Sequence, residues 1–295
     1  MQIDHAVCAF CGCDCDDISV TVEGDRITKV RNACVLGKAW FLSHAEPPDL
    51  PVARIDGKPV SLEQGIEESA RCLSESRYPF VYGLSSTSCE SQRKSVALAE
   101  VLGGCIDCCT SVCHGPSGMA LQGVGEPTCT LGEVKNRADL VVYWGSNPAE
   151  SHPRHMARYA VTPEGRFVPE GRKGRTVILV DVRRTKSSIA ADIFLQIKPG
   201  KDFELLWALQ ALVNGRKLDK ASAEAMGLAH ERLTELAERM MRCRFGVLFL
   251  GQGLTQTRGK HFNTSAAFLL VRALLADRVP FRRQFQPGIS TFQSR

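Results

Sequence analysis

DLVVYWGSNP, at residues 139–148, is an apolar run that ends in a polar turn. Two more runs, at 176–182 and 245–250, have the same form and meet Asp or Gly at their ends. Continuous apolar runs of this length predict strands that are buried on both faces, which is typical of parallel sheets. A polar loop and a helical pattern follow each run. We therefore expect an α/β fold, with a parallel sheet and helices on its faces.

The helices around these strands follow from the spacing of apolar side chains. They are expected at residues 151–161, 202–214, 221–241 and 264–276. Earlier elements are expected as a helix at 61–74, a buried strand at 80–84 and a helix at 90–102. Ser61 and Gln64 form a capping box for the first of these helices. Cys72 and Cys243 fall in or beside such elements and are expected to be small buried hydrophobes.

The loops at the carboxyl ends of parallel strands form the binding crevice of such sheets, so we expect the chemistry there. A turn that opens a helix offers backbone amides to a phosphate, and an acid at a strand tip suits a ribose or a base edge. Asp202 is also the expected N-cap of the helix after it. Each loop taken alone is also consistent with an ordinary turn or cap, but together they predict a site for a nucleotide-bearing cofactor. The candidate residues are Gly145, Asn147, Asp181, Gly200, Asp202 and Gly251.

Four cysteines near the start of the chain have the spacing Cys8-x2-Cys11-x3-Cys15-x18-Cys34. Alternating apolar and polar residues at 18–30 predict a β-hairpin that returns the chain to the fourth cysteine. Four converging thiolates suit either a [4Fe-4S] cluster or tetrahedral zinc. Zinc sites usually use two Cys-x2-Cys pairs, so the lone fourth cysteine favours the cluster. Unliganded thiols are a third interpretation, and Cys13 is spare in this scheme.

A second cysteine motif, SVCHGPS at residues 111–117, places Cys113 beside His114 on a bent backbone. The thiol could ligate a metal or act as a nucleophile, and the imidazole could act as an acid or a base. Taken alone, the motif is equally consistent with a structural cysteine. Other cysteines lie close by at residues 105, 108 and 109, but their spacing does not predict a second cage.

Size and composition exclude several classes of protein. The chain has 295 residues, of which 44% are hydrophobic, and this is enough for two domains or one large α/β unit. No apolar stretch reaches the roughly eighteen residues of a membrane span, and the N-terminus lacks a signal-peptide pattern. We therefore expect a cytoplasmic protein without membrane insertion, whose 13 cysteines favour metal binding or catalysis. The net charge of +5 is modest and spread along the chain, so no nucleic-acid partner is expected.

Four motifs together resemble the B subunit of formylmethanofuran dehydrogenase, within the wider group of molybdopterin oxidoreductases that includes formate dehydrogenases. They are the cysteine series at 8–34, SVCHGPS at 111–117, WGSNPAESHPRH at 144–155 and DVRRT at 181–185. The resemblance extends from about residue 5 to about residue 276. It implies a formate dehydrogenase/DMSO reductase-like fold. An iron–sulfur domain is expected at residues 1–55, and an α/β molybdopterin-binding catalytic region at residues 56–295.

The resemblance also implies cofactors and roles for individual residues. A [4Fe-4S] cluster would be held by Cys8, Cys11, Cys15 and Cys34. Two molybdopterin guanine dinucleotides would bind tungsten or molybdenum, with Cys113 as the protein ligand and His114 as the neighbouring catalytic histidine. Asn147 and Asp181 would lie on the dinucleotide-binding loops. Lys38 would lie where related enzymes place a lysine between cluster and pterin.

The implied reaction is the reversible reduction of CO2 to formate, with electrons that enter through the cluster. His114 could move the proton, and a cationic side chain should stabilise the developing carboxylate. In this family an amidohydrolase-like subunit condenses formate with methanofuran, and ferredoxin-like subunits supply electrons. The chain would thus be one part of a complex.

The C-terminal segment departs from the family pattern. Family members carry an active-site arginine in a Met-Arg-Gly-His-like segment and continue to a second pterin-binding region, whereas residues 277–288 read DRVPFRRQFQPG. We expect a shortened or altered terminus, in which Arg282 or Arg283 takes the arginine's role, or a disordered basic end. Two other functions stay open: a non-redox paralogue in a formyltransferase/hydrolase complex, and a zinc-stapled binding protein. The retained cysteines favour the redox function.

Overall fold

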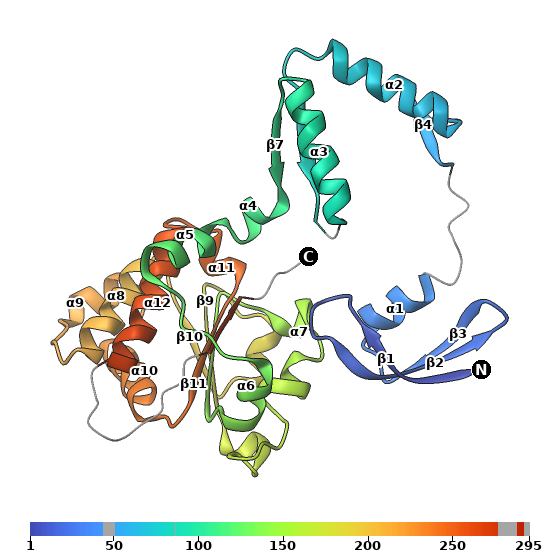
Figure 1. Ribbon diagram of the computed structural model, residues 1–295. Coiled ribbons are helices and arrows are strands. Elements are labelled where there is room, and N and C mark those ends of the chain that lie inside the picture. Colours follow the sequence, from blue (N-terminus) through green and yellow to red (C-terminus); the bar gives the residue numbers. More distant parts are fainter. Residues whose placement is uncertain (44–50, 86, 277–287, 292–295) are drawn as a thin grey trace.

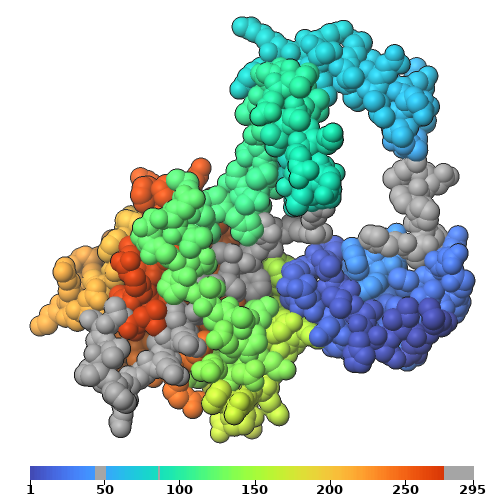
Figure 2. All heavy atoms as spheres, in the orientation of Figure 1, coloured from blue at the N-terminus to red at the C-terminus, as the bar shows by residue number. Residues whose placement is uncertain are grey.

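The computed structural model describes residues 1–43, 51–85, 87–276 and 288–291. Figure 1 shows a small N-terminal unit, an arm formed by residues 53–113, and a large α/β unit. In the space-filling view most of the arm stands clear of the α/β unit, whereas the N-terminal unit lies against the α/β unit (Figure 2). None of the helices in these ranges is long and apolar enough to cross a membrane.

The N-terminal unit is a three-stranded antiparallel sheet with one helix. Its elements are β1 (Gln2–Cys8), β2 (Cys15–Glu23), β3 (Arg26–Arg31) and α1 (Val35–Ser43). The predicted hairpin is confirmed as β2 and β3, with Gly24 at φ +59° in the turn. A small core of Ile18, Val20, Val30 and Phe41 lies beside the cysteines.

The arm contains two small sheets and two longer helices. Its elements are β4 (Ala53–Ile55), β5 (Lys58–Val60), α2 (Leu62–Glu75), β6 (Phe80–Gly83), α3 (Cys89–Val101), β7 (Cys105–Cys108) and α4 (Cys109–Cys113). The capping box at Ser61 and Gln64 is confirmed. The expectation of a buried strand is wrong, because Phe80 is 57% exposed and β6 pairs only with β7 among the described strands. Cys72 is exposed on α2, a helix that buries none of its residues, so its expected burial is wrong as well.

The α/β unit is built on the predicted parallel sheet, whose strand order is β10-β9-β8-β11-β12. Its strands are β8 (Leu140–Trp144), β9 (Thr176–Asp181), β10 (Ile193–Gln196), β11 (Gly246–Leu250) and β12 (Gly288–Thr291). Every described pairing in it is parallel, with Leu140 opposite Thr176 on one side and Gly246 on the other. The sequence predicted neither β10, which pairs with β9, nor β12, which pairs with β11.

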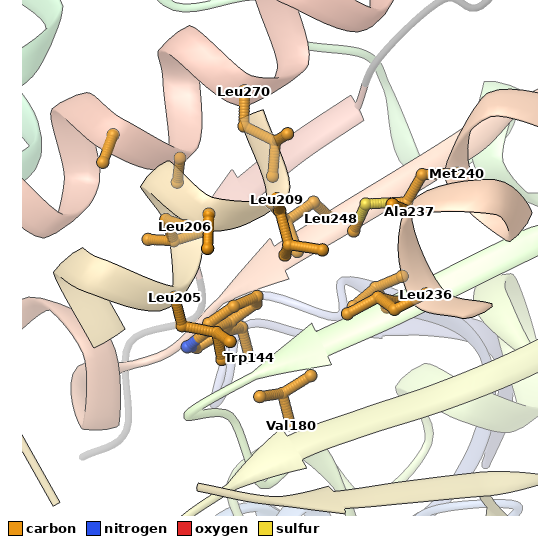
Figure 3. Close-up of a cluster of buried hydrophobic side chains, with 14 of the residues drawn as sticks. Trp144, Val180, Leu205, Leu206, Leu209, Leu236, Ala237, Met240, Leu248 and Leu270 are labelled. Atoms are coloured by element: carbon orange, nitrogen blue, oxygen red, sulfur yellow. The ribbon is translucent and has the colours of Figure 1, made fainter. Parts of the chain in front are cut away.

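Helices cover both faces of this sheet (Figure 1). They are α5 (Gly115–Val124), α6 (Leu131–Arg137), α7 (Pro148–Ser151), η1 (Met156–Ala160), η2 (Gly171–Gly174), η3 (Lys186–Ala190), α8 (Asp202–Val213), α9 (Lys220–Ala225), α10 (His230–Arg242), α11 (Gln252–Thr255) and α12 (His261–Ala276). The larger core lies between the sheet and α8, α10 and α12, where Trp144, Leu209 and Leu248 meet (Figure 3). On the opposite face Tyr143 and Phe249 pack with α6 and η1, as expected of strands whose side chains alternate between faces.

Two predicted helices are interrupted. The expected helix at 151–161 is wrong in form, because the chain makes the short α7, a turn at Pro153 and the π-helical η1. The expected helix at 221–241 is split into α9 and α10. At Gly227, between them, φ is +94°, and an added Cβ would lie 2.8 Å from the backbone nitrogen of Lys198. A side chain would therefore be strained there and would clash with the neighbouring loop.

Candidate functional site

A cavity of about 440 Å³ lies at the carboxyl ends of β8, β9 and β11. It is lined by Gly145, Ser146, Asn147, Glu150, Ser151, Asp181, Val182, Arg183, Thr185, Gly251, Gln252 and Gly253. This set includes four residues predicted from the sequence, namely Gly145, Asn147, Asp181 and Gly251. The cavity is called the cofactor pocket below. Its place agrees with the rule that open α/β sheets bind ligands where their strands end.

The glycines of the pocket allow the loop after β8 and the loop after β11 to contact each other. The backbone nitrogen of Gly253 donates to the carbonyl of Gly145 at 2.9 Å, and that of Gly251 donates to the carbonyl of Trp144 at 2.9 Å. A Cβ on Gly251 would lie 2.1 Å from the Gly145 carbonyl oxygen. Gly145 itself has φ +56°. The space beside Cα of Gly251 is therefore occupied by the neighbouring loop rather than open to a ligand.

Asn147 holds the pocket wall together. Its Oδ1 accepts hydrogen bonds from the hydroxyl of Ser187 at 2.8 Å and from the backbone nitrogen of Ser187 at 3.3 Å. Its Nδ2 donates to Glu150 at 2.5 Å. The side chain thus ties the loop after β8 to η3, an element that follows β9. Asp181 ends β9, and its carboxylate accepts a hydrogen bond of 3.2 Å from the backbone nitrogen of Arg183.

Two hydroxyls of the pocket are buried and have no hydrogen-bond partner among the described residues. They belong to Ser146, which is 3% exposed, and Thr185, which is 9% exposed. A buried hydroxyl that makes no hydrogen bond is unfavourable by about 1–3 kcal/mol. Polar ligand atoms that fill the pocket could supply the missing partners. Sequence reasoning missed both residues, although each is part of a motif quoted above.

Gly200 and Asp202 are not among the residues that line the pocket. Asp202 is not the N-cap of α8 but its first residue, and the cap is Lys201. The Asp202 carboxylate is buried and accepts a hydrogen bond of 2.9 Å from Nε1 of Trp144. Burial raises the pKa of Asp202, and the nearby charge of Asp181 raises it further. Asp202 therefore lies just behind the pocket and within electrostatic reach of it.

The four predicted cysteines line a second, smaller cavity, called the cysteine cage below. Its lining residues are Cys8, Phe10, Cys11, Cys15, Ile18, Cys34, Gly37 and Arg154. The first turn of α1 comes close to the cysteines, because a Cβ on Gly37 would lie 3.1 Å from Sγ of Cys8. Burial raises the pKa of the Cys8 thiol, whereas the Arg154 charge lowers it. Within the described ranges, no group of three or more His, Cys, Asp or Glu side chains is arranged to hold a metal ion.

The segment after the pocket reaches the cysteine cage. The Arg154 guanidinium donates two hydrogen bonds to the Asp17 carboxylate, at 2.6 and 2.5 Å. The hydroxyl of Tyr159 donates to the backbone carbonyl of Cys13 at 2.7 Å. His152 is hydrogen-bonded to the backbone of Cys11. Residues 145–160 therefore join the two sites, and this segment is called the connecting segment below.

Cys113 and His114 are not among the lining residues of the cofactor pocket. Cys113 ends α4, and His114 lies between α4 and α5. The side-chain amide of Gln256 donates to the carbonyl of Val112, and this contact places the motif beside α11, whose first residue Gln252 lines the pocket. Lys38 is exposed on α1, with its backbone nitrogen bonded to the carbonyl of Cys34 at 2.8 Å. The two candidate arginines, Arg282 and Arg283, lie outside the described residues.

Comparison with known proteins gives both a family and individual relatives. A family model described as molybdopterin oxidoreductase matches residues 66–278. The B subunit of the tungsten-containing formylmethanofuran dehydrogenase 2 of Methanocaldococcus jannaschii is 44% identical over 277 residues, which cover 91% of this chain and 63% of the relative. The chain thus spans less than two thirds of that relative's length.

Two solved structures share the fold. One is the formyltransferase/hydrolase complex of Methylorubrum extorquens with methylofuran, with a TM-score of 0.59 and 20% identity over 81% of this chain and 60% of that one. The other is acetylene hydratase from Pelobacter acetylenicus, with a TM-score of 0.63 and 15% identity over 94% of this chain and 44% of that one. The family match covers well over half of the sequence, and the parallel sheet, its pocket and these structures agree with it. The chain therefore belongs to the molybdopterin oxidoreductase family.

Proposed function

We propose that this chain is the catalytic redox subunit of a formylmethanofuran dehydrogenase, which reversibly reduces CO2 to formate at a tungsten or molybdenum centre. The structural observation that carries the proposal is the connecting segment. One end of the segment lines the nucleotide-sized cofactor pocket, and Arg154 near its other end lines the cavity that contains the four cysteines. An electron donor and a redox cofactor need this kind of proximity. The 44% identity to the B subunit of a tungsten-containing enzyme supports the specific reaction.

The cofactor pocket fits the guanine dinucleotide part of a molybdopterin cofactor. Its buried hydroxyls, Ser146 and Thr185, could bond to phosphate or ribose oxygens, which would satisfy both groups. Asp181 could accept hydrogen bonds from a guanine edge or a ribose. Asn147 acts indirectly, because its amide already holds the pocket wall. Gly200, Asp202 and Lys38 would contribute from outside the pocket.

The cysteine cage fits a [4Fe-4S] cluster. Four thiols line one cavity, and the chain places Gly37 where a side chain would crowd Cys8. Within the proposal, residues 1–55 form the cluster domain and residues 56–295 form part of the pterin-binding region.

The proposed chemistry combines CO2, two electrons and one proton to give formate. A tungsten or molybdenum ion, which the pterins and the Cys113 thiolate would hold, would supply two-electron redox chemistry. His114 is placed next to the ligand in the sequence and could hold or deliver the proton at a ring nitrogen. A cation near the developing carboxylate would stabilise its charge.

The proposal also includes partners. An amidohydrolase-like subunit would condense formate with methanofuran, and ferredoxin-like subunits would deliver electrons to the cluster. A non-redox paralogue in a formyltransferase/hydrolase complex would share the fold, as the 20% identical structure does, but would hold neither tungsten nor molybdenum.

Metal analysis and spectroscopy of the full chain test the proposal. The protein is purified without oxygen, together with the partner proteins that bind it, and is assayed for iron, sulfide, tungsten, molybdenum and zinc. We expect at least four iron atoms per chain, an EPR signal after reduction by dithionite, and viologen-linked turnover of formate or CO2. Zinc alone, without iron–sulfur absorbance, contradicts the redox proposal. Iron without tungsten or molybdenum contradicts the catalytic part.

Two alanine variants separate the proposed ligand from its neighbours. Cys113→Ala should abolish turnover and leave the cluster's EPR signal intact. Cys109→Ala changes another partly buried cysteine of α4 and should retain turnover. If Cys113→Ala keeps full turnover, then Cys113 is not the metal ligand.

A further inference from the structure

We propose that Arg154 raises the reduction potential of the cluster in the cysteine cage, and that Asp17 holds the arginine in place and limits its effect. This inference rests on the proposed cluster, and it adds a specific electrostatic control to it. The control comes from the connecting segment of the α/β unit, 137 residues away from Asp17 in the sequence.

The first observation is the position of Arg154. Among the residues that line the cage within the described ranges, Arg154 is the only one with a charged side chain. It lines this cavity together with the four cysteines, so its positive charge lies beside the thiols that would hold the cluster. Negative charge in the cage is therefore stabilised by a cation that the N-terminal unit does not itself supply.

The second observation is that this cation is held in place. The guanidinium makes a two-pronged contact with Asp17, and its side chain is 19% exposed. Asp17 in turn accepts a hydrogen bond of 2.9 Å from Nδ2 of Asn32, and forms an ion pair of 2.7 Å with Arg158. Planar two-pronged contacts fix both the position and the orientation of an arginine. The charge is thus fixed beside the cage.

The effect on the cluster follows from charge balance. Reduction by a low-potential donor adds one electron to the cluster and transfers no atom. A fixed cation nearby stabilises the more negative, reduced form, and the potentials of such clusters depend on nearby charge and exposure. Asp17 carries the opposite charge but does not line the cage, so the cation has the larger influence.

The test is a redox titration of the cluster, followed by EPR, in the full chain purified anaerobically with its bound partner proteins. Arg154→Gln removes the charge and keeps a polar side chain. We expect at least a tenfold decrease in the equilibrium constant for one-electron reduction, equivalent to a potential lower by about 59 mV. Arg154→Lys keeps the charge and should recover most of the loss. Asp17→Asn removes the opposing charge and should shift the potential upward.

Arg172→Gln is the matched control, because Arg172 also pairs with an aspartate, at 2.6 Å from Asp192, and does not line the cage. It should leave the potential unchanged. An Arg154→Gln protein that holds the cluster at the wild-type potential overturns the inference and leaves the proposed function standing. If this variant fails to assemble a cluster, Arg154→Met, which also removes the charge, decides, and a wild-type potential in that variant overturns the inference. A wild-type protein without iron and sulfide overturns both proposals.

Discussion

Replacing Gly251 by alanine tests whether the two loops of the cofactor pocket depend on direct contact between their backbones. The new Cβ would lie 2.1 Å from the carbonyl oxygen of Gly145 and 2.5 Å from Cα of Ser146. Both distances are far shorter than van der Waals contact, and the atoms that are met belong to the backbone, which cannot rotate away. The loop after β11 must therefore move away from the loop after β8.

The size of the effect follows from what this movement breaks. Two backbone hydrogen bonds of 2.9 Å join the loops, and each contributes about 1 kcal/mol. Overpacking of a tight contact adds about 1–3 kcal/mol. Alanine also restricts the unfolded chain more than glycine does, and this offsets about 0.4–1 kcal/mol of the loss in stability. We expect Gly251→Ala to lower the free energy of unfolding by roughly 3 kcal/mol.

Urea unfolding, followed by circular dichroism and tryptophan fluorescence, measures this loss. Gly123→Ala provides a matched control, because it adds the same methyl group in α5 with no described atom within 4 Å. The control should be as stable as wild type or up to about 1 kcal/mol more stable, since alanine favours helix. If Gly251→Ala unfolds within about 0.5 kcal/mol of wild type, the argument that the loops need this contact is refuted.

Three further predictions concern buried contacts around the two sites. Trp144→Phe removes the indole N–H that donates to the buried Asp202 carboxylate and should lower the free energy of unfolding by about 2–3 kcal/mol in urea, whereas a loss under about 1 kcal/mol would contradict that role. Burial lowers the pKa of His155 to about 3, so the unfolded state binds the extra proton, and stability should decrease by about 1.3 kcal/mol from pH 7 to pH 5.5. The same measurement on His155→Phe should lack that component of the pH dependence. Tyr159→Phe loses the hydrogen bond to the Cys13 carbonyl and should cost about 1 kcal/mol, with faster proteolysis of the N-terminal unit as the readout.

The sequence predicted three strands of the central sheet because the signal for each of these buried strands is local. β8, β9 and β11 appear as continuous apolar runs. β9 and β11 are found within one residue of their expected bounds, and β8 is the apolar part of the stretch 139–148. The predictions of two continuous helices, at 151–161 and 221–241, failed for a physical reason. Apolar spacing continues through Pro153 and Gly227, whereas the backbone cannot continue a helix there. β12 has only four residues, and its pairing with β11 depends on tertiary context.

The candidate site was predictable where position along a strand determines it. Gly145, Asn147, Asp181 and Gly251 all lie at or just after the ends of strands, and parallel strands bring their ends together. What these residues do could not be predicted in the same way. The bond from Ser187 to Asn147 and the packing of Gly251 on the next loop join segments that are distant in the sequence.

The connecting segment makes the two sites mechanically dependent on each other. Gly145 lines the pocket, Arg154 lines the cage, and the buried His155 packs the segment against the sheet. The His155 ring meets Phe249 edge-on at 4.9 Å and Tyr143 at 5.9 Å between ring centroids, so the segment is fixed to β8 and β11 by buried aromatic contacts. A shift of this anchor would move the pocket wall and the arginine together, since few residues separate them and the protein interior is close-packed. Substitutions at His155 should therefore change the pocket and the cage jointly, whereas substitutions at Asp17 should affect the cage alone.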